Sequence, residues 1–144
     1  MTTKTVTTAI AAALTLVMAM PVAADGNRAT ITQYGWQNGA GTSQVGVRNQ
    51  MTVWQQGGRN TTISTQDGRR NQTVVSQSGR GNDTVATQTG RCNVLGVSQS
   101  GNHNTVDVDQ NGGCNALGVI QVGNGNNAET TQYGHGNVTV VVQN

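Results

Sequence analysis

The chain has 144 residues, half of them Gly, Asn, Gln or Thr, and its formal net charge is only +2. Charged residues make up only 10% of the chain. Aromatic residues make up 3%, and large apolar side chains are too few for a conventional globular core. Disorder is also disfavoured, because disordered chains are rich in charge and proline and this chain contains one proline. A polar composition rich in Asn and Gln is typical of ladder-forming β structure, in one domain at most.

The amino-terminal segment, 1–24, has the pattern of a secretory signal peptide. Lys4 supplies a positive charge, residues 9–20 form an apolar run, and residues 22–24 are small side chains ahead of a cleavage point. The run is shorter than the roughly 20 apolar residues of a membrane-spanning helix. The sequence therefore predicts a cleaved signal peptide, 1–24, and an exported mature chain, 25–144. A retained anchor is the alternative.

An eleven-residue period runs through the predicted mature chain without a slip. The unit is N-x5-Q-x-G-x-x, and it occurs eleven times, with the last copy ending at Asn144. Repeats of fixed length indicate a stacked architecture in which each unit contacts mainly its neighbours. The Asn positions are Asn27, Asn38, Asn49, Asn60, Asn71, Asn82, Asn93, Asn104, Asn115, Asn126 and Asn137. The Gln positions are Gln33, Gln44, Gln55, Gln66, Gln77, Gln88, Gln99, Gln110, Gln121, Gln132 and Gln143. The Gly positions are Gly35, Gly46, Gly57, Gly68, Gly79, Gly90, Gly101, Gly112, Gly123 and Gly134.

Alternation inside the unit identifies a strand. The second and fourth residues after each Asn are apolar, Thr or Ser and never charged, whereas the first, third and fifth hold every charge found within the predicted strands. Successive side chains of a strand point to opposite faces, so Asn, the second and fourth residues and Gln are expected to face inward. The four residues x-G-x-x form a tight turn in which Gly supplies a positive φ.

The predicted fold is all-β: a β-solenoid with two strands per coil and about five and a half coils, each rising about 4.8 Å. Seven-residue strands alternate with four-residue arcs. The core is two facing rows of small apolar side chains, flanked by an Asn ladder and a Gln ladder. In each ladder we expect an amide to donate to and accept from the identical amide one coil away. No helix is expected beyond the signal peptide.

Two segments show the unit most clearly, Gln77-Ser78-Gly79-Arg80-Gly81-Asn82 and Gln132-Tyr133-Gly134-His135-Gly136-Asn137. They resemble the curlin repeat of curli subunits, and the resemblance extends from Asn27 to Gln143. Curlins are secreted bacterial subunits that stack as β-solenoids into extracellular amyloid fibres of the biofilm matrix. The resemblance implies a cell-surface fibre reached through the periplasm, with a nucleator subunit, an outer-membrane secretion pore and periplasmic chaperones as partners.

Two features depart from the curlin pattern. Every predicted strand begins with Asn, whereas curlin repeats often carry Ser at the start of alternate strands. The repeat also begins at Asn27, close to the predicted cleavage point, where the major curlin has a non-repeat targeting segment.

The ends and the charges favour head-to-tail stacking. Asn27 opens directly into a strand and residues 138–142 are uncharged and β-prone, so both ends are expected to be adhesive edges. A soluble monomer whose ends fray is the alternative. Residues 25–91 hold seven Arg and three Asp, a sum of +4, and residues 92–144 hold two Asp and one Glu, a sum of −3. Opposite ends therefore attract weakly.

The arcs carry most of the arginines. Arg48 and Arg70 fall at equivalent arc positions one coil apart, where like charges repel and slow premature assembly. The default for these side chains is a solvated turn. A nucleic-acid or anionic-polysaccharide site on the arcs is the alternative.

Cys92 and Cys114 are separated by two full repeat units, and each immediately precedes the Asn of its unit. They are expected on the same arc of adjacent coils, with Cα atoms about 5 Å apart, which is within disulfide range. Export permits oxidation. A disulfide is the prediction and two free thiols are the alternative.

The sequence gives little support to catalysis. His103 and His135 fall in predicted turns without a repeated acidic or nucleophilic partner, and the pair Asp107 and Asp109 does not recur in other units. No phosphate-binding glycine loop opens a helix. The prediction is therefore a protein without enzyme activity, metal site or cofactor.

The function predicted for the chain is that of a secreted structural subunit that self-assembles head-to-tail into curli-like amyloid fibres for adhesion and aggregation. A monomeric secreted β-solenoid that binds ice or another surface is one alternative. Its weakness is that the outward row Thr52, Val74, Gly96, Gly118 and Val140 is not a regular threonine array. The minor nucleator subunit of the same fibre is the other alternative.

Overall fold

The computed structural model describes residues 26–144, and the predicted signal peptide lies outside this range. The described residues form eleven β-strands and no helix. In chain order the strands are β1 (Arg28–Trp36), β2 (Gly39–Val47), β3 (Gln50–Gly58), β4 (Thr61–Arg69), β5 (Gln72–Arg80), β6 (Asp83–Arg91), β7 (Val94–Asn102), β8 (Thr105–Gly113), β9 (Ala116–Asn124), β10 (Asn127–His135) and β11 (Val138–Gln143).

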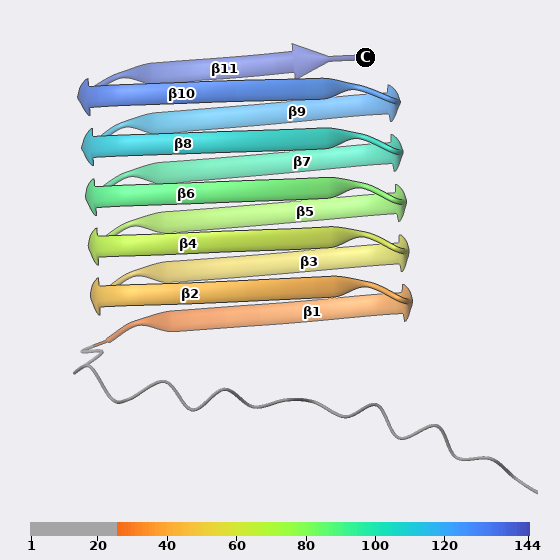
Figure 1. The fold of residues 1–144 in the computed structure, drawn as a ribbon, viewed down its shortest axis with the longest axis horizontal. Coiled ribbons are helices and arrows are strands. Elements are labelled where there is room, and N and C mark those ends of the chain that lie inside the picture. The colour runs from red at the N-terminus through yellow and green to blue at the C-terminus, as the bar shows by residue number, and fades with distance from the viewer. Residues whose placement is uncertain (1–25) are drawn as a thin grey trace, which may run out of the picture.

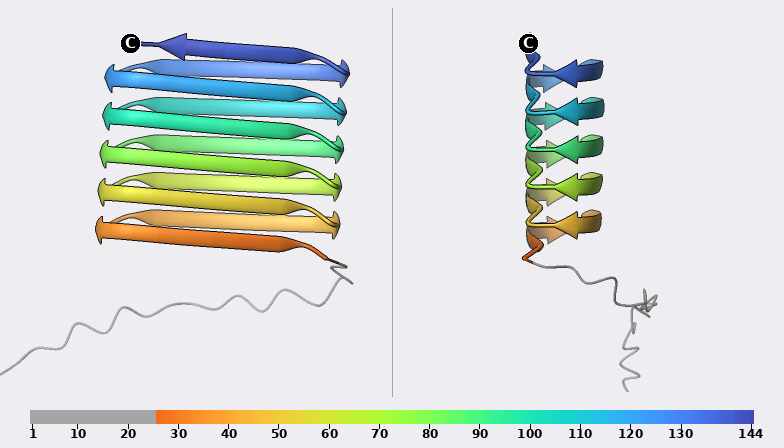
Figure 2. Two further views of the ribbon diagram at one scale, coloured as in Figure 1. Left: turned by 180° about the vertical axis from the view of Figure 1, so that it is seen from behind. Right: turned by 90° about the vertical axis from the view of Figure 1, so that its left-hand side faces the viewer.

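The strands wind into a thin two-layered solenoid (Figure 1). Odd-numbered strands form a six-stranded sheet in the order β1-β3-β5-β7-β9-β11, and even-numbered strands form a five-stranded sheet facing it. Every strand is parallel to the strand two places on, so that partners are two repeat units apart, as in Gln55 opposite Gln77. The two layers lie close together when viewed along the strands (Figure 2). The predicted all-β solenoid with two strands per coil is confirmed.

The strands are longer than the sequence predicted. Ten of them have nine residues rather than seven, and only two residues, such as Gln37 and Asn38, separate consecutive strands. The added residues belong to the predicted arcs. Because each arc lies on the equivalent arc of the next coil, its backbone continues the parallel ladder, and Gly35 is paired with Gly57. The arcs are therefore hydrogen-bonded parts of the sheets.

The core is narrow and follows the second and fourth positions of the unit. Its buried apolar side chains are Met51, Val53, Val75, Ala86, Leu95, Val97, Val106, Val108, Leu117, Val119 and Ala128. Threonines replace them through β4, β5 and β6, where Thr62, Thr73 and Thr84 are fully buried. Two facing rows of small side chains are what the alternating pattern predicted. Among residues 26–144 no helix is long and apolar enough to cross a membrane.

Candidate functional site: the inner ladders and the open edges

The glutamines form one column along each sheet. In the odd-numbered strands each Gln Nε2 donates to Oε1 of the Gln one coil further on, from Gln33 to Gln143, at 2.6–3.0 Å. The even-numbered strands repeat this arrangement from Gln44 to Gln132, at 2.8–2.9 Å. The structure thus places the predicted Gln positions in amide-to-amide ladders, and each ladder has one direction along the axis.

The glutamine columns also join the two sheets. The second Nε2 proton of Gln77 is donated to the carbonyl oxygen of Thr61 on the facing strand, at 2.9 Å. The Thr84 hydroxyl accepts from Gln77 at 3.2 Å and donates to Oε1 of Gln99 at 2.9 Å. These bonds satisfy amides that have no access to water, and a buried amide without partners would cost about 1–3 kcal/mol.

The asparagine columns bond mainly to the backbone, which corrects the predicted amide-to-amide ladder. Asn71 is representative: its Oδ1 accepts the N–H of Asn93 at 3.1 Å, and its Nδ2 donates to the carbonyl oxygens of Gly90 at 3.1 Å and Asp67 at 3.3 Å. Two amide-to-amide bonds add to this pattern, Asn82 to Asn60 and Asn104 to Asn82, both 3.1 Å. Asn is one methylene shorter than Gln and lies beside the arcs, so the arc carbonyls are its nearest acceptors.

Burial of the two columns depends on the coil. Seven asparagines, Asn49, Asn60, Asn71, Asn82, Asn93, Asn104 and Asn115, are at most 1% exposed. Eight glutamines, Gln55, Gln66, Gln77, Gln88, Gln99, Gln110, Gln121 and Gln132, are at most 5% exposed. The remaining members of both columns lie in the end coils and are half-buried or exposed, because no further coil covers them.

The arc glycines have a backbone that other residues adopt only with strain. All ten glycines at this position have φ between 98° and 126°. A Cβ added at Gly79 would overlap the carbonyl oxygen of Gly101 on the next coil. At Gly123 and Gly134 the added atom meets no such carbonyl, because no coil of the described residues lies beyond them. Glycine here sets how closely successive coils approach.

A second left-handed position was missed by the sequence reasoning. The residue before each Asn has φ of 48–58° where it is not glycine, as at Gln37, Arg48 and His103. The signal lay in the sequence, since Gly81, Gly125 and Gly136 occupy the same place in other units. Side chains other than Gly cost about 1–2 kcal/mol in this conformation, which the surrounding ladder offsets.

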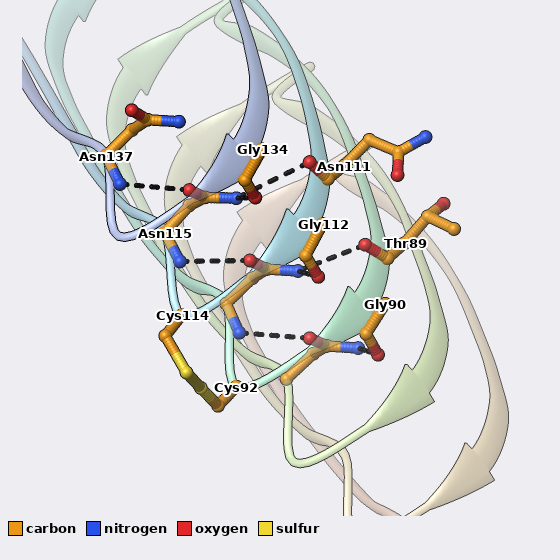
Figure 3. Close-up of a disulfide and its surroundings, with 11 residues drawn as sticks. Thr89, Gly90, Cys92, Asn111, Gly112, Cys114, Asn115, Gly134 and Asn137 are labelled. Carbon is orange, nitrogen blue, oxygen red and sulfur yellow. Dashed lines mark hydrogen bonds between the residues drawn. A yellow bond between two sulfur atoms is a disulfide. The ribbon is translucent and has the colours of Figure 1, made fainter.

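Cys92 and Cys114 occupy this second position on adjacent coils, and the structure joins them in a disulfide. Their Cα atoms are 4.6 Å apart. Figure 3 shows the bridge beside the asparagine column, where Asn137 N–H donates to Oδ1 of Asn115. The bridge therefore ties together the arcs that follow β6 and β8.

Reduction of the Cys92–Cys114 bridge is expected to lower the free energy of unfolding by roughly 3 kcal/mol, because the bridge closes a loop of about twenty residues in the unfolded chain. Denaturant titration of residues 25–144 with and without reductant measures the loss. The double variant Cys92→Ser/Cys114→Ser should match the reduced protein and show no further effect of reductant. Equal stability of all forms would contradict the stabilising role.

The outermost strands have unpartnered edges. β11 pairs with β9 and β10 pairs with β8, and no strand of residues 26–144 follows either of them. Within the stack, the first N–H of each strand points to the next coil, as Ala116 N–H donates to Asn137 O at 2.8 Å. Since backbone groups alternate in direction along a strand, the N–H groups of Val138, Val140 and Val142 point away from β9. These three side chains are 67–75% exposed.

The described residues offer no constellation for metal chemistry. Among residues 26–144, no three His, Cys, Asp or Glu side chains gather where they could hold a metal ion. His103 and His135 lie in or at the end of arcs and are exposed. The features that the structure brings together are the inner ladders, the disulfide and the two open ends.

The comparisons with known proteins point to one repeat family. The family model of the curlin-associated repeat matches residues 59–90 and 101–134. Both matched segments follow the same eleven-residue register as the rest of the solenoid. A comparison with curated proteins finds no match. The resemblance stated from the two quoted segments is thereby confirmed.

Proposed function

We propose that this curlin-repeat protein is a secreted structural subunit that assembles head-to-tail into extracellular amyloid fibres of the biofilm matrix, for adhesion and aggregation. The repeat family suggests a fibre subunit built from copies of one chain. The observation that carries the proposal is that β1–β2 and β10–β11 have outer edges without a partner strand among residues 26–144. An open parallel edge accepts a further strand by β-augmentation.

The directions of the ladders favour head-to-tail over head-to-head contact. Every inner Gln donates forward along the chain, and within residues 26–144 no Gln lies beyond Gln132 and Gln143 to accept from Nε2. Gln143 Nε2 donates to Asn127 O alone, and Gln132 Nε2 donates to Ala116 O and Thr139 Oγ1. At the other end, no residue of 26–144 donates to Oε1 of Gln33 or Gln44. Donors at one end therefore meet acceptors at the other. Two identical ends brought together would oppose donor to donor.

The side-chain oxygens of the asparagine columns accept from the coil that follows, the reverse of the glutamine columns, and lead to the same conclusion. Asn137 N–H donates to Oδ1 of Asn115, so each side-chain oxygen serves the coil that follows it. A second copy placed beyond β11 would supply N–H groups to Oδ1 of Asn126 and Asn137. Stacking thus extends both columns without changing their geometry, and amide ladders of this kind stabilise amyloid.

The family resemblance adds partners to the proposal: a nucleator subunit, an outer-membrane secretion pore and periplasmic chaperones. The chain itself could also serve as the minor nucleator of the same fibre. An ice-binding or surface-binding monomer is less well supported, because the outward row on β3, β5, β7, β9 and β11 holds two glycines, Gly96 and Gly118, beside Val74 and Val140.

The variant Val140→Pro is expected to end fibre growth at the β11 edge. Proline removes an N–H that points away from β9 and places a ring in the path of the next coil, while the bonds between β11 and β9 are kept. Residues 25–144 of the wild type should give thioflavin-positive fibres whose diffraction shows a reflection at about 4.8 Å. Supplied alone, the variant should add no more than one subunit to the β11 end of a wild-type seed. In trace amounts beside the wild-type protein, it should stop elongation of the seeds.

The matched control is Val85→Pro, which places proline in the interior of the five-stranded sheet and should prevent folding rather than capping. Circular dichroism separates the two cases, because the Val140→Pro monomer should keep its β signal. Seeded growth of Val140→Pro at the wild-type rate would overturn head-to-tail addition at β11. A wild-type chain that stays monomeric would overturn the proposed function itself.

A further inference from the structure

One edge of the solenoid carries an array of four arginines. They lie at the last residue of β4 and of β6 and directly after β2 and β4, and are called here the arginine edge: Arg48, Arg69, Arg70 and Arg91. Arg69 and Arg91 are ladder partners on adjacent coils, and Arg48 and Arg70 occupy the same arc position one coil apart. With Val47 and the Cys92–Cys114 bridge, the arginine edge lines a recess of about 420 Å³.

The arginine edge has no counter-charge within the described chain. None of its guanidinium groups forms an ion pair or a side-chain hydrogen bond with any group of residues 26–144, Asp67 included, and all four side chains are exposed. Equivalent backbone positions of adjacent coils are about 4.8 Å apart, so like charges are held near one another. An array of this kind attracts a polyanion.

The opposite edge of the solenoid provides a contrast. There Arg59 lies 5.0 Å and Arg80 5.4 Å from the centre of the Trp36 ring, in cation–π contact. Arg59 Nε also donates to Oε1 of Gln37 at 3.0 Å. These two guanidinium groups are engaged by the protein's own side chains. Arg28 is a single exposed arginine at the start of β1, so the array of unengaged guanidinium groups within residues 26–144 is the arginine edge.

We infer that the arginine edge binds a carboxylated polysaccharide. Guanidinium pairs with carboxylate through two parallel hydrogen bonds, and a linear polyuronate offers carboxylates at regular intervals to rows of guanidinium groups repeated along the solenoid axis. The apolar floor formed by Val47 and the disulfide suits the C–H face of a sugar ring. The β4–β6 ladder keeps Arg69 and Arg91 in register, and the disulfide holds the arc beside Arg91 to the next coil.

The lining of the recess favours a sugar polymer over single-stranded nucleic acid. Binding of single strands uses aromatic platforms on which bases stack. No Trp or Tyr lines this recess, and Trp36 lies on the other edge against Arg59 and Arg80. The site does not depend on fibre formation, because the arginine edge is complete within one molecule.

Binding of polygalacturonate to oxidised, freshly prepared residues 25–144 at about 0.15 M salt tests the inference. The variant Arg69→Gln/Arg91→Gln is expected to weaken binding by about tenfold, through the loss of two bidentate contacts. The matched variant Arg59→Gln/Arg80→Gln removes the same charge from the opposite edge and should change the affinity less than about twofold. The variant Arg69→Lys/Arg91→Lys keeps the charge but loses the planar guanidinium that makes two parallel hydrogen bonds. Its affinity for polygalacturonate should lie between those of the wild type and Arg69→Gln/Arg91→Gln.

Three outcomes would overturn the inference. They are an equal loss of affinity in the two glutamine variants, equally strong binding of neutral dextran, and binding of DNA with the same affinity and the same dependence on Arg69 and Arg91. Thioflavin-positive fibre growth is measured in parallel on every variant. It should be preserved in all of them, so a failure of polysaccharide binding is distinguishable from a failure of the proposed assembly.

Discussion

Replacing Gly79 with alanine is expected to lower the free energy of unfolding of the solenoid by at least about 1.4 kcal/mol. Its φ of 116° is strained for any residue with a Cβ, and such strain costs about 1–3 kcal/mol. The new methyl group would also overlap the carbonyl oxygen of Gly101, so the two coils must separate and lose ladder bonds. A free-energy change of about 1.4 kcal/mol corresponds to a tenfold change in the ratio of folded to unfolded chain.

Gly96→Ala is the matched control for this prediction. Gly96 lies in β7, where an added Cβ meets no atom within 4 Å and φ is not positive. The same chemical change should therefore leave the free energy of unfolding unchanged or raise it by up to about 1 kcal/mol. Denaturant titration of residues 25–144 carrying each substitution gives both values. A Gly79→Ala protein as stable as Gly96→Ala would show that coil spacing does not depend on the arc glycines.

The eleven-residue register made most of the fold predictable. The spacing of Asn and Gln placed the strands, their inward faces and the cysteines on adjacent coils, because the side-chain period of a strand is two and the coil is two units. The glycine after each Gln indicated positive φ, since that conformation favours a residue without Cβ. The spacing of residues along the chain was therefore sufficient to predict the strands, their inward faces and the positive φ of the arc glycines.

The sequence could not predict which partner each amide would choose. Asn and Gln carry the same functional group, but the shorter Asn side chain meets the arc carbonyls of Gly90 and Asp67, and Gln77 reaches Gln99. The reach of each side chain against the arc becomes known only with the backbone in place. The extension of the ladder through the arcs was missed for the same reason.

Features that break the repeat were equally hidden. Trp36 covers Gly58 on the next coil so closely that an added Cβ at Gly58 would meet the indole ring at 2.5–2.8 Å. Neither residue occupies a repeated position of the unit, so no register marked the pair. The arginine edge is similar: the sequence showed Arg48 and Arg70 in equivalent arcs, and the fold brought Arg69 and Arg91 beside them.

Fibres of a polypeptide defined as residues 25–144 are expected to relate successive subunits by a half-turn about the fibre axis, added to the slow twist of the solenoid. β1 and β11 both belong to the six-stranded sheet, so the position that continues the solenoid lies beyond β10 in the other sheet. When β1 of a second subunit occupies this position and pairs with β10 of the first subunit, β2 of the second subunit pairs with β11 of the first. Placing β1 on β11 instead would leave a gap of one strand with unpaired backbone groups.

Two in-register deletions test this parity argument. Removal of residues 61–71, one unit, gives ten strands, and the half-turn should disappear because the first and last strands then lie in different sheets. Removal of residues 50–71, one full coil, gives nine strands, and the half-turn should persist. Helical reconstruction of the fibres should give rises per subunit of about 26 Å for the full polypeptide, about 24 Å for ten strands and about 22 Å for nine. The same rotation in all three fibres would mean that backbone pairing does not set the contact between subunits.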